Sequence, residues 1–407
     1  MQSNQISRRT FVRAAGGAMA VATAVPRAVR GAAAERPLKV GVVGCGGRGT
    51  GAAKDAIKAA PGISITALAD VFPDRLEQCR QELKDLAVVE DKYCFTGLDG
   101  YKKLLETDVD YVILATPPYF RPEHLAACIE AGKHVFAEKP VGVDPVGVRK
   151  IMETGRLAEK KNLSIVAGTQ RRHHRGYIET IRKLHDGAIG KIVAGQIYWN
   201  GGQAWFKRRQ AGWSDQDWLL RDWNNWTFLS GDHIVEQHVH NIDVACWVLG
   251  SHPIKAMSMG ARLRRVTGNQ YDFFCTDFTF PDDVHILSQC RQISGTAKEV
   301  SEHMRGERGR SNCNGWIAGQ PLLKFDVNPY VQEHTDLIAA IRKGEPINEA
   351  QAVAESTMAA VMARTSAYTG KVVTWEEMMT SDMVLGPPEY ELTRENILAH
   401  IPMPGRS

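Results

Sequence analysis

The chain has 407 residues, 43% of them hydrophobic, and 50 Lys and Arg residues against 46 Asp and Glu residues give a formal net charge of +4. This length fits two domains with separate cores, and the near-neutral charge, without a basic stripe interleaved with aromatic residues, argues against a nucleic-acid-binding surface. The eight cysteines form no Cys-x-x-Cys pair, which indicates neither a zinc site nor a disulfide framework.

The first 34 residues have the three parts of a twin-arginine export signal. A basic start, Ser-Arg-Arg-Thr-Phe at 7–11, precedes an apolar run over 14–25, and small residues at 31–34 suit cleavage. We therefore predict a signal peptide over 1–34, passage through the twin-arginine export machinery, and a periplasmic or secreted protein; a disordered tail or a transit peptide is the alternative. The apolar run is too short to span a bilayer, so no transmembrane segment is expected. Cleavage would remove five arginines and no acidic residue, changing the formal net charge from +4 to −1.

Residues 35–168 alternate short apolar runs with amphipathic segments, a pattern typical of a Rossmann domain with a doubly wound parallel sheet. We expect strands over 38–43, 63–69, 93–95, 111–115, 134–137 and 163–167, and helices over 49–60, 73–86, 98–106, 122–131 and 145–160.

A glycine fingerprint follows the first predicted strand and opens the first predicted helix. Gly44 permits a tight turn, Gly46 lets the backbone approach a pyrophosphate, and Gly49 lets the helix pack on the strand. The helix N-terminus, which includes Gly47 and Arg48, would stabilise the phosphate charge. This position in the strand order makes the fingerprint a strong indication of a dinucleotide site.

Asp70 ends the second predicted strand, where it could accept hydrogen bonds from the adenosine ribose hydroxyls and repel a 2′-phosphate. The sequence therefore favours NAD over NADP. A cap for the helix that begins near Pro73 is the alternative role of Asp70.

The ends of the fourth and fifth strands read Ala115-Thr116-Pro117, with His124 close behind, and Glu138-Lys139-Pro140. With these residues the chain resembles the Gfo/Idh/MocA oxidoreductases, a family named for glucose–fructose oxidoreductase and inositol dehydrogenase. The resemblance implies that Thr116, Pro117, His124, Glu138 and Lys139 contact the cofactor, and that Lys139 lies beside the nicotinamide and the reacting hydroxyl.

Lys139 also follows a parallel strand at its carboxyl end, where open α/β sheets place ligands. A lysine partly removed from water there could take part in proton transfer. A surface pair with Glu138 is the alternative.

Residues 169–407 change character, with longer alternating runs over 271–280 and 284–293 that predict an antiparallel hairpin. The family resemblance implies a C-terminal α+β domain with an open, mainly antiparallel sheet that binds substrate and often forms the interface of a homo-oligomer. Helical periodicity predicts two late helices over 330–342 and 350–368, which could pack back on the Rossmann domain.

A second group of titratable residues lies between Gly231 and Asp243. On one continuous helix, Glu236, His240 and Asp243 would share a face, with His233 one turn earlier. The resembling family has a motif here ending in His-x-x-Asp, whose histidine contacts the substrate; Glu236 replaces its usual aspartate and His238 a common glycine. Solvent-facing Glu-His pairing and a divalent metal site built from His233, Glu236, His240 and Asp243 are the alternatives; we predict no metal.

Six of the nine tryptophans lie within thirty residues. Because indole faces stack on sugar rings, we predict a carbohydrate pocket rimmed by this segment, chiefly Trp205 and Trp213, with Arg171, Arg172 and His173 nearby. Packing beneath the loop or in a subunit interface is the alternative. The aromatic residues of the segment are Trp199, Trp205, Phe206, Trp213, Trp218, Trp223, Trp226 and Phe228.

These features predict an NAD-dependent oxidoreductase that oxidises a secondary hydroxyl of a sugar or related polyol. Lys139, His240 and Glu236 would relay and orient the hydroxyl proton, with His238 and Asp243 near the substrate. Free NAD would be scarce outside the inner membrane, so we expect the cofactor to remain bound. One alternative is a redox glycosidase, which resembles the NAD-dependent glycosidases of the same family; another is a secreted, catalytically inactive sugar-binding protein.

Overall fold

The computed structural model describes residues 36–322, 327–387 and 390–405. The predicted export signal lies outside this range. No helix in the described part of the chain is long and apolar enough to span a membrane.

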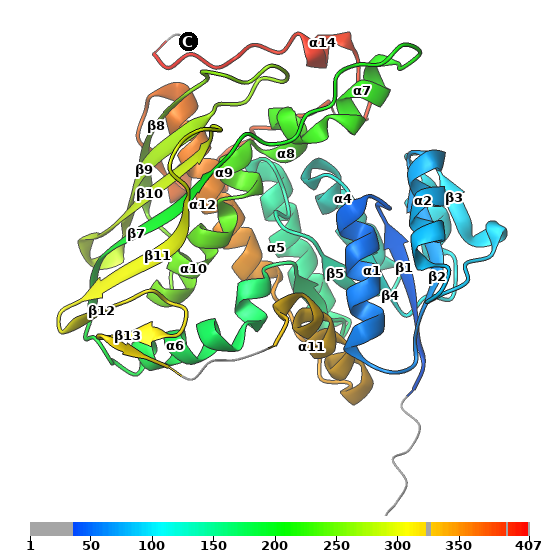
Figure 1. Ribbon diagram of the computed structural model, residues 1–407, viewed down its shortest axis with the longest axis horizontal. Helices are drawn as coiled ribbons and strands as arrows, with labels where there is room; N and C mark the ends of the chain where they lie inside the picture. Colours follow the sequence, from blue (N-terminus) through cyan, green and yellow to red (C-terminus); the bar gives the residue numbers. More distant parts are fainter. Residues whose placement is uncertain (1–35, 323–326, 388–389, 406–407) are drawn as a thin grey trace, which may run out of the picture. The chain divides into compact units, whose positions relative to one another are not determined.

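Six parallel strands form the first sheet, in the order β3-β2-β1-β4-β5-β6 expected of a doubly wound Rossmann fold. The predicted elements of residues 35–168 are all present, with ends shifted by three residues or fewer (Figure 1). The strands are β1 (Leu38–Val43), β2 (Ile63–Asp70), β3 (Cys94–Thr96), β4 (Tyr111–Leu114), β5 (His134–Ala137) and β6 (Ile165–Ala167), and the helices are α1 (Gly47–Ala59), α2 (Pro73–Leu83), α3 (Gly100–Leu105), α4 (Arg121–Glu130) and α5 (Pro145–Lys160).

Both faces of this sheet are buried, which explains why its strands are continuous apolar runs. On one face, Val40 and Val42 of β1 pack with Ala52 and Ala56 of α1. The other face packs against α4 and α5. Helix α11 (Pro329–Lys343) adds Leu337 and Ile338 to the first of these cores and contacts α1, so a late helix covers the Rossmann sheet.

Nine strands form the second sheet, in the order β14-β13-β12-β11-β7-β10-β9-β8-β15. Pairing is antiparallel except between β7 and β10, and the predicted hairpin is confirmed as β9 and β10. The strands are β7 (Ile192–Gly201), β8 (Lys255–Ala261), β9 (Phe273–Phe280), β10 (Val284–Gln292), β11 (Glu299–Gly306), β12 (Gly309–Ser311), β13 (Trp316–Ile317), β14 (Gln320–Pro321) and β15 (Val373–Thr374).

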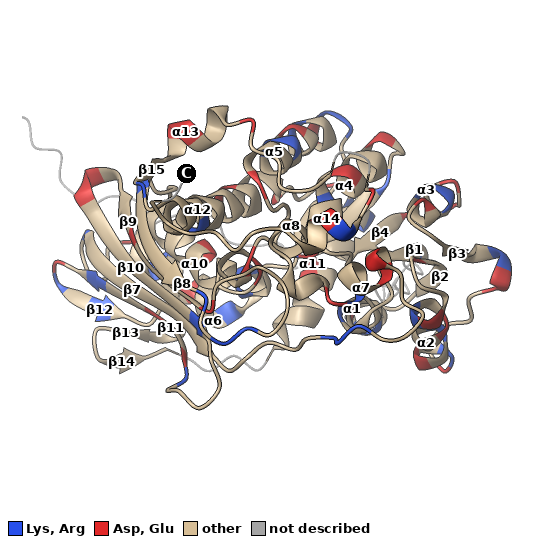
Figure 2. Ribbon diagram, turned by 90° about the horizontal axis from the view of Figure 1, so that it is seen from above, with Lys and Arg blue, Asp and Glu red and all other residues tan. Residues whose placement is uncertain are grey.

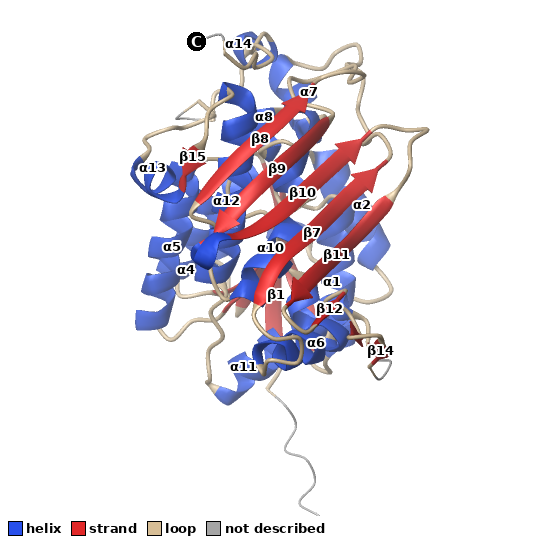
Figure 3. Ribbon diagram, turned by 90° about the vertical axis from the view of Figure 1, so that its left-hand side faces the viewer, coloured by secondary structure: helices blue, strands red, loops and turns tan. Residues whose placement is uncertain are grey.

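Helices α10 and α12 pack on one face of this sheet, and Figure 3 shows the other face without a covering helix among the described residues. The described chain thus combines a Rossmann sheet with a second, open and mainly antiparallel sheet, as predicted. The remaining helices are α6 (Arg175–His185), α7 (Asp215–Arg221), α8 (Thr227–Ser230), α9 (His233–Glu236), α10 (Val239–Leu249), α12 (Ala350–Thr369), α13 (Trp375–Thr380) and α14 (Arg394–Ile397).

The segment 233–243 is not one continuous helix, so the prediction of a shared face is wrong. Helix α9 ends at Glu236, and α10 starts at Val239. The chain enters α9 through Asp232, which has a φ of 73° and accepts a hydrogen bond from the backbone N–H of His233. Because of this break, the side chains of α10 do not continue the face of α9.

Gly49 offers a direct test of the strand-to-helix packing. A Cβ at Gly49 would lie 1.8 Å from the carbonyl oxygen of Gly44, a backbone atom that cannot move freely, whereas a Cβ at Gly47 would meet nothing within 4 Å. We expect Gly49→Ala to lower the free energy of unfolding by about 1–3 kcal/mol, the usual cost of overpacking. Chemical denaturation should show no comparable loss for Gly47→Ala, and equal effects of the two variants would contradict this assignment.

Candidate active site

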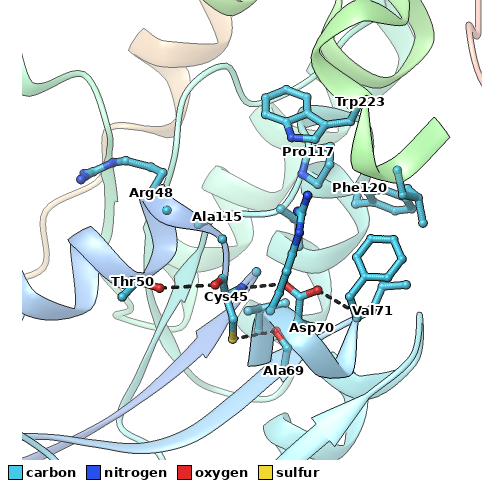
Figure 4. Close-up of a pocket in the computed structure, with 18 of the residues that line it drawn as sticks. Cys45, Arg48, Thr50, Ala69, Asp70, Val71, Ala115, Pro117, Phe120 and Trp223 are labelled. Atoms are coloured by element: carbon cyan, nitrogen blue, oxygen red, sulfur yellow. Dashed lines mark hydrogen bonds between the residues drawn. The ribbon is translucent and has the colours of Figure 1, made fainter. Parts of the chain in front are cut away.

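A cleft of about 450 Å³ lies at the carboxyl edge of the Rossmann sheet. Its lining includes the backbone of Gly44 to Arg48, Asp70 at the end of β2, and Ala115 to Pro117 after β4 (Figure 4). Parallel strands that diverge at this edge leave the crevice in which such folds bind ligands. The predicted fingerprint residues Gly44, Gly46, Gly47 and Arg48 are therefore in one place.

The geometry of the fingerprint fits a pyrophosphate. Gly44 has a φ of +95°, and a Cβ there would lie 2.7 Å from the backbone of Thr116. Gly46 caps α1 without any side-chain hydrogen bond, and the first turn of α1 contains no acidic residue. The first amides of a 13-residue helix are thus not capped by a side chain, an arrangement that stabilises an anion.

Asp70 lines the cleft and braces the loops around it. One carboxylate oxygen accepts a hydrogen bond from the backbone N–H of Cys45 at 2.7 Å, and the other from that of Phe72 at 2.9 Å. Burial raises the pKa of Asp70. Each oxygen keeps capacity for a further donor, so the carboxylate can accept ribose hydroxyls while it also orders the start of α2.

Thr116 and His124 meet at the edge of the cleft, where the Thr116 hydroxyl lies 3.2 Å from His124 Nδ1. Burial lowers the pKa of His124 to about 3, so its imidazole is neutral. The buried Arg121, which was not predicted, donates to the carbonyl of Thr116 and, at 2.6 Å, to that of Pro140. It thereby ties the loop after β4 to the loop after β5, where the Lys139-Pro140 peptide is cis.

Two residues of the predicted catalytic group, Lys139 and Glu236, form an ion pair, and the third, His240, lies close enough for the charge of Lys139 to affect its pKa. Lys139 Nζ donates to Glu236 Oε1 at 3.0 Å and to the backbone carbonyl of Glu236 at 2.5 Å. Both side chains are only 10% exposed. His240 stacks on Trp199 with ring centroids 5.6 Å apart. Burial, and then the charges of Lys139 and Arg171, hold the pKa of His240 well below its ordinary value, so the imidazole is neutral.

Arg48 and Glu138 support the site from behind. The Arg48 guanidinium forms an ion pair with Glu138 and binds Glu333 of α11 at 3.1 Å. In Figure 4 its side chain points away from Asp70 and Trp223. Glu138 also accepts the backbone N–H of Lys139 at 3.2 Å. Both residues were predicted to contact the cofactor. In the structure Arg48 is among the residues that line the cleft, whereas Glu138 is not, and its carboxylate binds Arg48 and the backbone N–H of Lys139.

Four of the predicted substrate residues, Arg172, His173, His238 and Asp243, are engaged in contacts within the chain. Asp243 is 1% exposed, receives two hydrogen bonds from Arg172 Nε and Nη2, and accepts the Ser356 hydroxyl at 2.6 Å. His173 is buried between Asp336 and Glu349. His238 is fully buried and lies 2.7 Å from the Ser288 hydroxyl. His238 lies in the break between α9 and α10, and Asp243 lies on α10, whereas Arg172 and His173 come from the turn after β6.

Arg171 is the member of the 171–173 run that faces the catalytic group. It forms a 2.5 Å ion pair with Glu302, and its guanidinium lies over the Trp199 ring at 5.7 Å. Trp199 also stacks on His240, so the side chains of Arg171 and His240 both pack against the same tryptophan ring.

The tryptophan segment, residues 199–228, contributes to several parts of the structure, and its role as the rim of a sugar pocket stays a prediction. Trp205 lines the cleft at the carboxyl edge of the Rossmann sheet, the predicted dinucleotide site, which we call the dinucleotide cleft. Neither Lys139 nor His240 is among the residues that line this cleft. The Trp213 ring lies against Arg221, and Trp226 is buried in a third core. Trp199 stacks on His240 of the predicted catalytic group. The loop path that brings Trp205 to the cleft could not be read from its sequence spacing.

The alternative of a metal site finds no geometric support. His233 pairs with Asp232 at 2.9 Å, while Asp243 is bound to Arg172 and Glu236 to Lys139. The part of the chain that the structure describes contains no group of three His, Cys, Asp or Glu residues that could hold a metal ion.

Several residues of the cleft were not predicted. Aromatic residues just after strand ends could have been found, since strand ends border such sites. The lining residues that come from the tryptophan segment could not be assigned to this cleft from the local sequence pattern. The unpredicted lining residues include Phe72, Arg75, Leu98, Tyr101, Phe120, Lys207, Leu220 and Trp223.

Residues 38–169 match the model of the GFO_IDH_MocA family, described as an oxidoreductase family with an NAD-binding Rossmann fold. The chain is 27% identical over 215 residues to a glycosyl hydrolase family 109 protein of Streptomyces coelicolor, covering 48% of this chain and 45% of that protein. It is 26% identical over 241 residues to the scyllo-inositol 2-dehydrogenase (NAD(+)) of Bacillus subtilis, covering 58% and 61% respectively. The chain therefore spans about half the length of these curated relatives.

The fold is also similar to the crystal structure of scyllo-inositol dehydrogenase from Lactobacillus casei with bound NAD(H) and scyllo-inositol. The TM-score is 0.63 at 19% identity, over 83% of this chain and 99% of that one. The match over residues 38–169 agrees with the uncapped glycine fingerprint and the Glu-Lys-Pro turn, so this part of the chain is similar to the NAD-binding Rossmann domain of that oxidoreductase family.

Proposed function

We propose that the protein oxidises a secondary hydroxyl of a sugar or related polyol with NAD. The observation that carries this proposal is the group of Lys139, Glu236 and His240 beside the strand edge that holds the cleft. The similarity to the scyllo-inositol 2-dehydrogenase of Bacillus subtilis supports a polyol substrate.

The residues of the cleft fit NAD. The amides that open α1 would face the pyrophosphate, and the Asp70 carboxylate would accept the adenosine ribose hydroxyls and disfavour a 2′-phosphate. When bound, NAD supplies the hydride acceptor, and the protein supplies orientation and electrostatics.

The three polar residues divide the work of handling the proton. Lys139 donates two of its three ammonium N–H groups to Glu236, so one N–H remains for the oxygen of a substrate hydroxyl. His240 is neutral and keeps a nitrogen lone pair that can accept the hydroxyl proton. Glu236, which also accepts the Gln237 amide at 2.5 Å, positions the Lys139 ammonium.

A glycosidase that acts by transient oxidation, elimination, water addition and re-reduction is the second candidate. The similarity to the glycosyl hydrolase family 109 protein of Streptomyces coelicolor favours it. Cleavage of a glycoside in deuterated water distinguishes the two, because elimination requires loss of a C–H proton next to the oxidised carbon. Deuterium in the product at the carbon next to the oxidised one would support the glycosidase. The third reading, an inactive sugar-binding protein, gives no reason for the Lys139–Glu236 pair.

We also propose that residues 1–34 direct export through the twin-arginine pathway to the periplasm or beyond, and that NAD is loaded before export. The uncovered face of the second sheet, with Met257 and Met259 59% and 61% exposed, would serve a homo-oligomer. Basic and acidic residues are interspersed over the described elements (Figure 2), in keeping with a small-molecule substrate and no nucleic acid.

Replacing Lys139 tests the catalytic assignment. We expect Lys139→Met to lower kcat by about 10²–10⁴-fold, because the variant loses the donor that orients the hydroxyl. Steady-state NADH formation with a panel of inositols and aldoses measures the effect. Lys150→Met, which removes an exposed lysine paired with Glu123, should keep normal kcat. A Lys139→Met enzyme as fast as the wild type would contradict the role of Lys139.

The pH profile tests the role of His240. Because its pKa is held well below that of an ordinary histidine, about 6.5, we expect kcat/KM to stay constant as the pH falls from about 8 to 6.5. Protonation of His240 should reduce the rate only at more acid pH. A loss of activity with a midpoint at or above about 6.5, absent in His240→Asn, would contradict a neutral, buried His240.

A further inference from the structure

The outer wall of the dinucleotide cleft comes from the tryptophan segment, far along the chain from the Rossmann fingerprint. Trp205, Lys207 and Trp223 line the same cleft as Asp70. Figure 4 shows Trp223 on the side of Pro117 and Phe120. We propose that this segment is a fixed cover that binds the adenosine half of NAD and slows its release. The inference rests on the proposed use of NAD.

The position of the wall identifies the half of the cofactor it would contact. Asp70 marks the end that receives the adenosine ribose. The lining also includes Arg75, Gln78 and Glu82 of α2 and Leu98 after β3, which are on the β2–β3 side with Asp70, whereas Lys139 and His240 are not part of it. The tryptophan wall therefore faces the adenosine end, away from the reacting group.

The wall has the chemistry to hold a purine and its phosphates. Trp205 is 47% exposed, a large aromatic face left partly open at the cleft, and it meets Trp223 edge to face with centroids 6.0 Å apart. Aromatic faces stack on nucleic acid bases with about 1–3 kcal/mol per base. Lys207 brings a cation to the cleft and forms no ion pair within the described residues.

The backbone that carries this wall is held in place. Asp222, which is fully buried, accepts the backbone N–H of Lys207 at 2.6 Å. The Trp218 indole donates to the Lys207 carbonyl at 2.8 Å, and the Asn225 amide to the Trp205 carbonyl at 3.1 Å. Contacts within the chain thus hold the backbone of the wall, so little conformational entropy of this loop is lost when a ligand binds.

The segment is fastened to the Rossmann domain at the start of α2. Arg221 of α7 forms two hydrogen bonds with Asp74, at 2.7 and 2.9 Å, and its guanidinium lies 3.8 Å above the Phe72 ring. A shared core joins Phe72 and Phe120 to Leu220 and to Leu392 near the C-terminus. In Figure 1, α7 and α14 lie together at the top of the molecule, above the Rossmann helices.

The release rate of the nucleotide tests the cover. NADH bound to the full chain is chased with excess NAD, and the loss of its fluorescence gives the rate. We expect Trp205→Ala to release NADH about tenfold faster than the wild type, the loss expected when one aromatic stack is removed. Trp316→Ala, which removes a partly exposed tryptophan beside Arg310 on the second sheet, should release NADH at the wild-type rate.

A second pair of variants tests the fastening without changing the wall. Asp74→Asn should also speed release several-fold, because Arg221 loses its charged partner. Asp186→Asn is the matched control, since Asp186 is 63% exposed and pairs with Arg182, as Asp74 is 62% exposed and pairs with Arg221. Asp186→Asn should leave the rate unchanged.

The outcomes separate this inference from the proposed function. Unchanged release from both Trp205→Ala and Asp74→Asn, or release from the wild type within seconds, overturns the cover even if the protein oxidises polyols. A Lys139→Met protein that is inactive but holds NADH as slowly as the wild type supports the cover independently of catalysis. Failure of NAD to bind at all overturns both.

Discussion

The Lys139–Glu236 ion pair is the contact on which the arrangement of the active site depends. Lys139 comes from the turn after β5, and Glu236 ends α9 in the second half of the chain, so the pair brings the two halves together at the edge of the cleft. With both side chains 10% exposed, the pair has given up most of its hydration. Such a pair is stable only when further hydrogen bonds compensate, and the Glu236 carbonyl and the Gln237 amide provide them.

Other buried polar contacts hold the same junction. Glu333 of α11, fully buried, fixes Arg48, and Arg48 fixes Glu138 next to Lys139. Arg364 of α12 donates to the carbonyls of Val143 and Gly231, one from each half. The consequence is a site whose charged groups are positioned by residues distant in sequence. Burial, and then the charge of Lys139, lower the pKa of His240 and keep it neutral.

Regular local patterns made the fold predictable. Strand and helix periodicity located every element of the Rossmann sheet, because burial on both faces leaves a strong apolar signal. Gly44 and Gly49 were recognisable because a tight turn and a close approach allow no side chain. Lys139, Glu236 and His240 were selected from their position and from a family resemblance, and the structure pairs Lys139 with Glu236.

Features that depend on long-range contacts could not be predicted from local sequence. Helix α9 ends at Glu236 and α10 starts at Val239, so the continuous helix expected here is absent, and the buried Asp243 and His238 are bound by Arg172 and Ser288. The tryptophan spacing suggested a sugar surface, but the fold of the loop around Asp222 brings Trp205 to the dinucleotide cleft. Neither result leaves a periodic trace in the sequence, because both follow from tertiary packing.

Hydride transfer to the bound cofactor is the most direct test of the account. Protein loaded with NAD is mixed with inositols, aldoses and glycosides that carry deuterium on their hydroxyl-bearing carbons, and the released nucleotide is analysed by mass. The account predicts a substrate that places deuterium on the nicotinamide. NAD that binds but gains no deuterium from any of these compounds would contradict it.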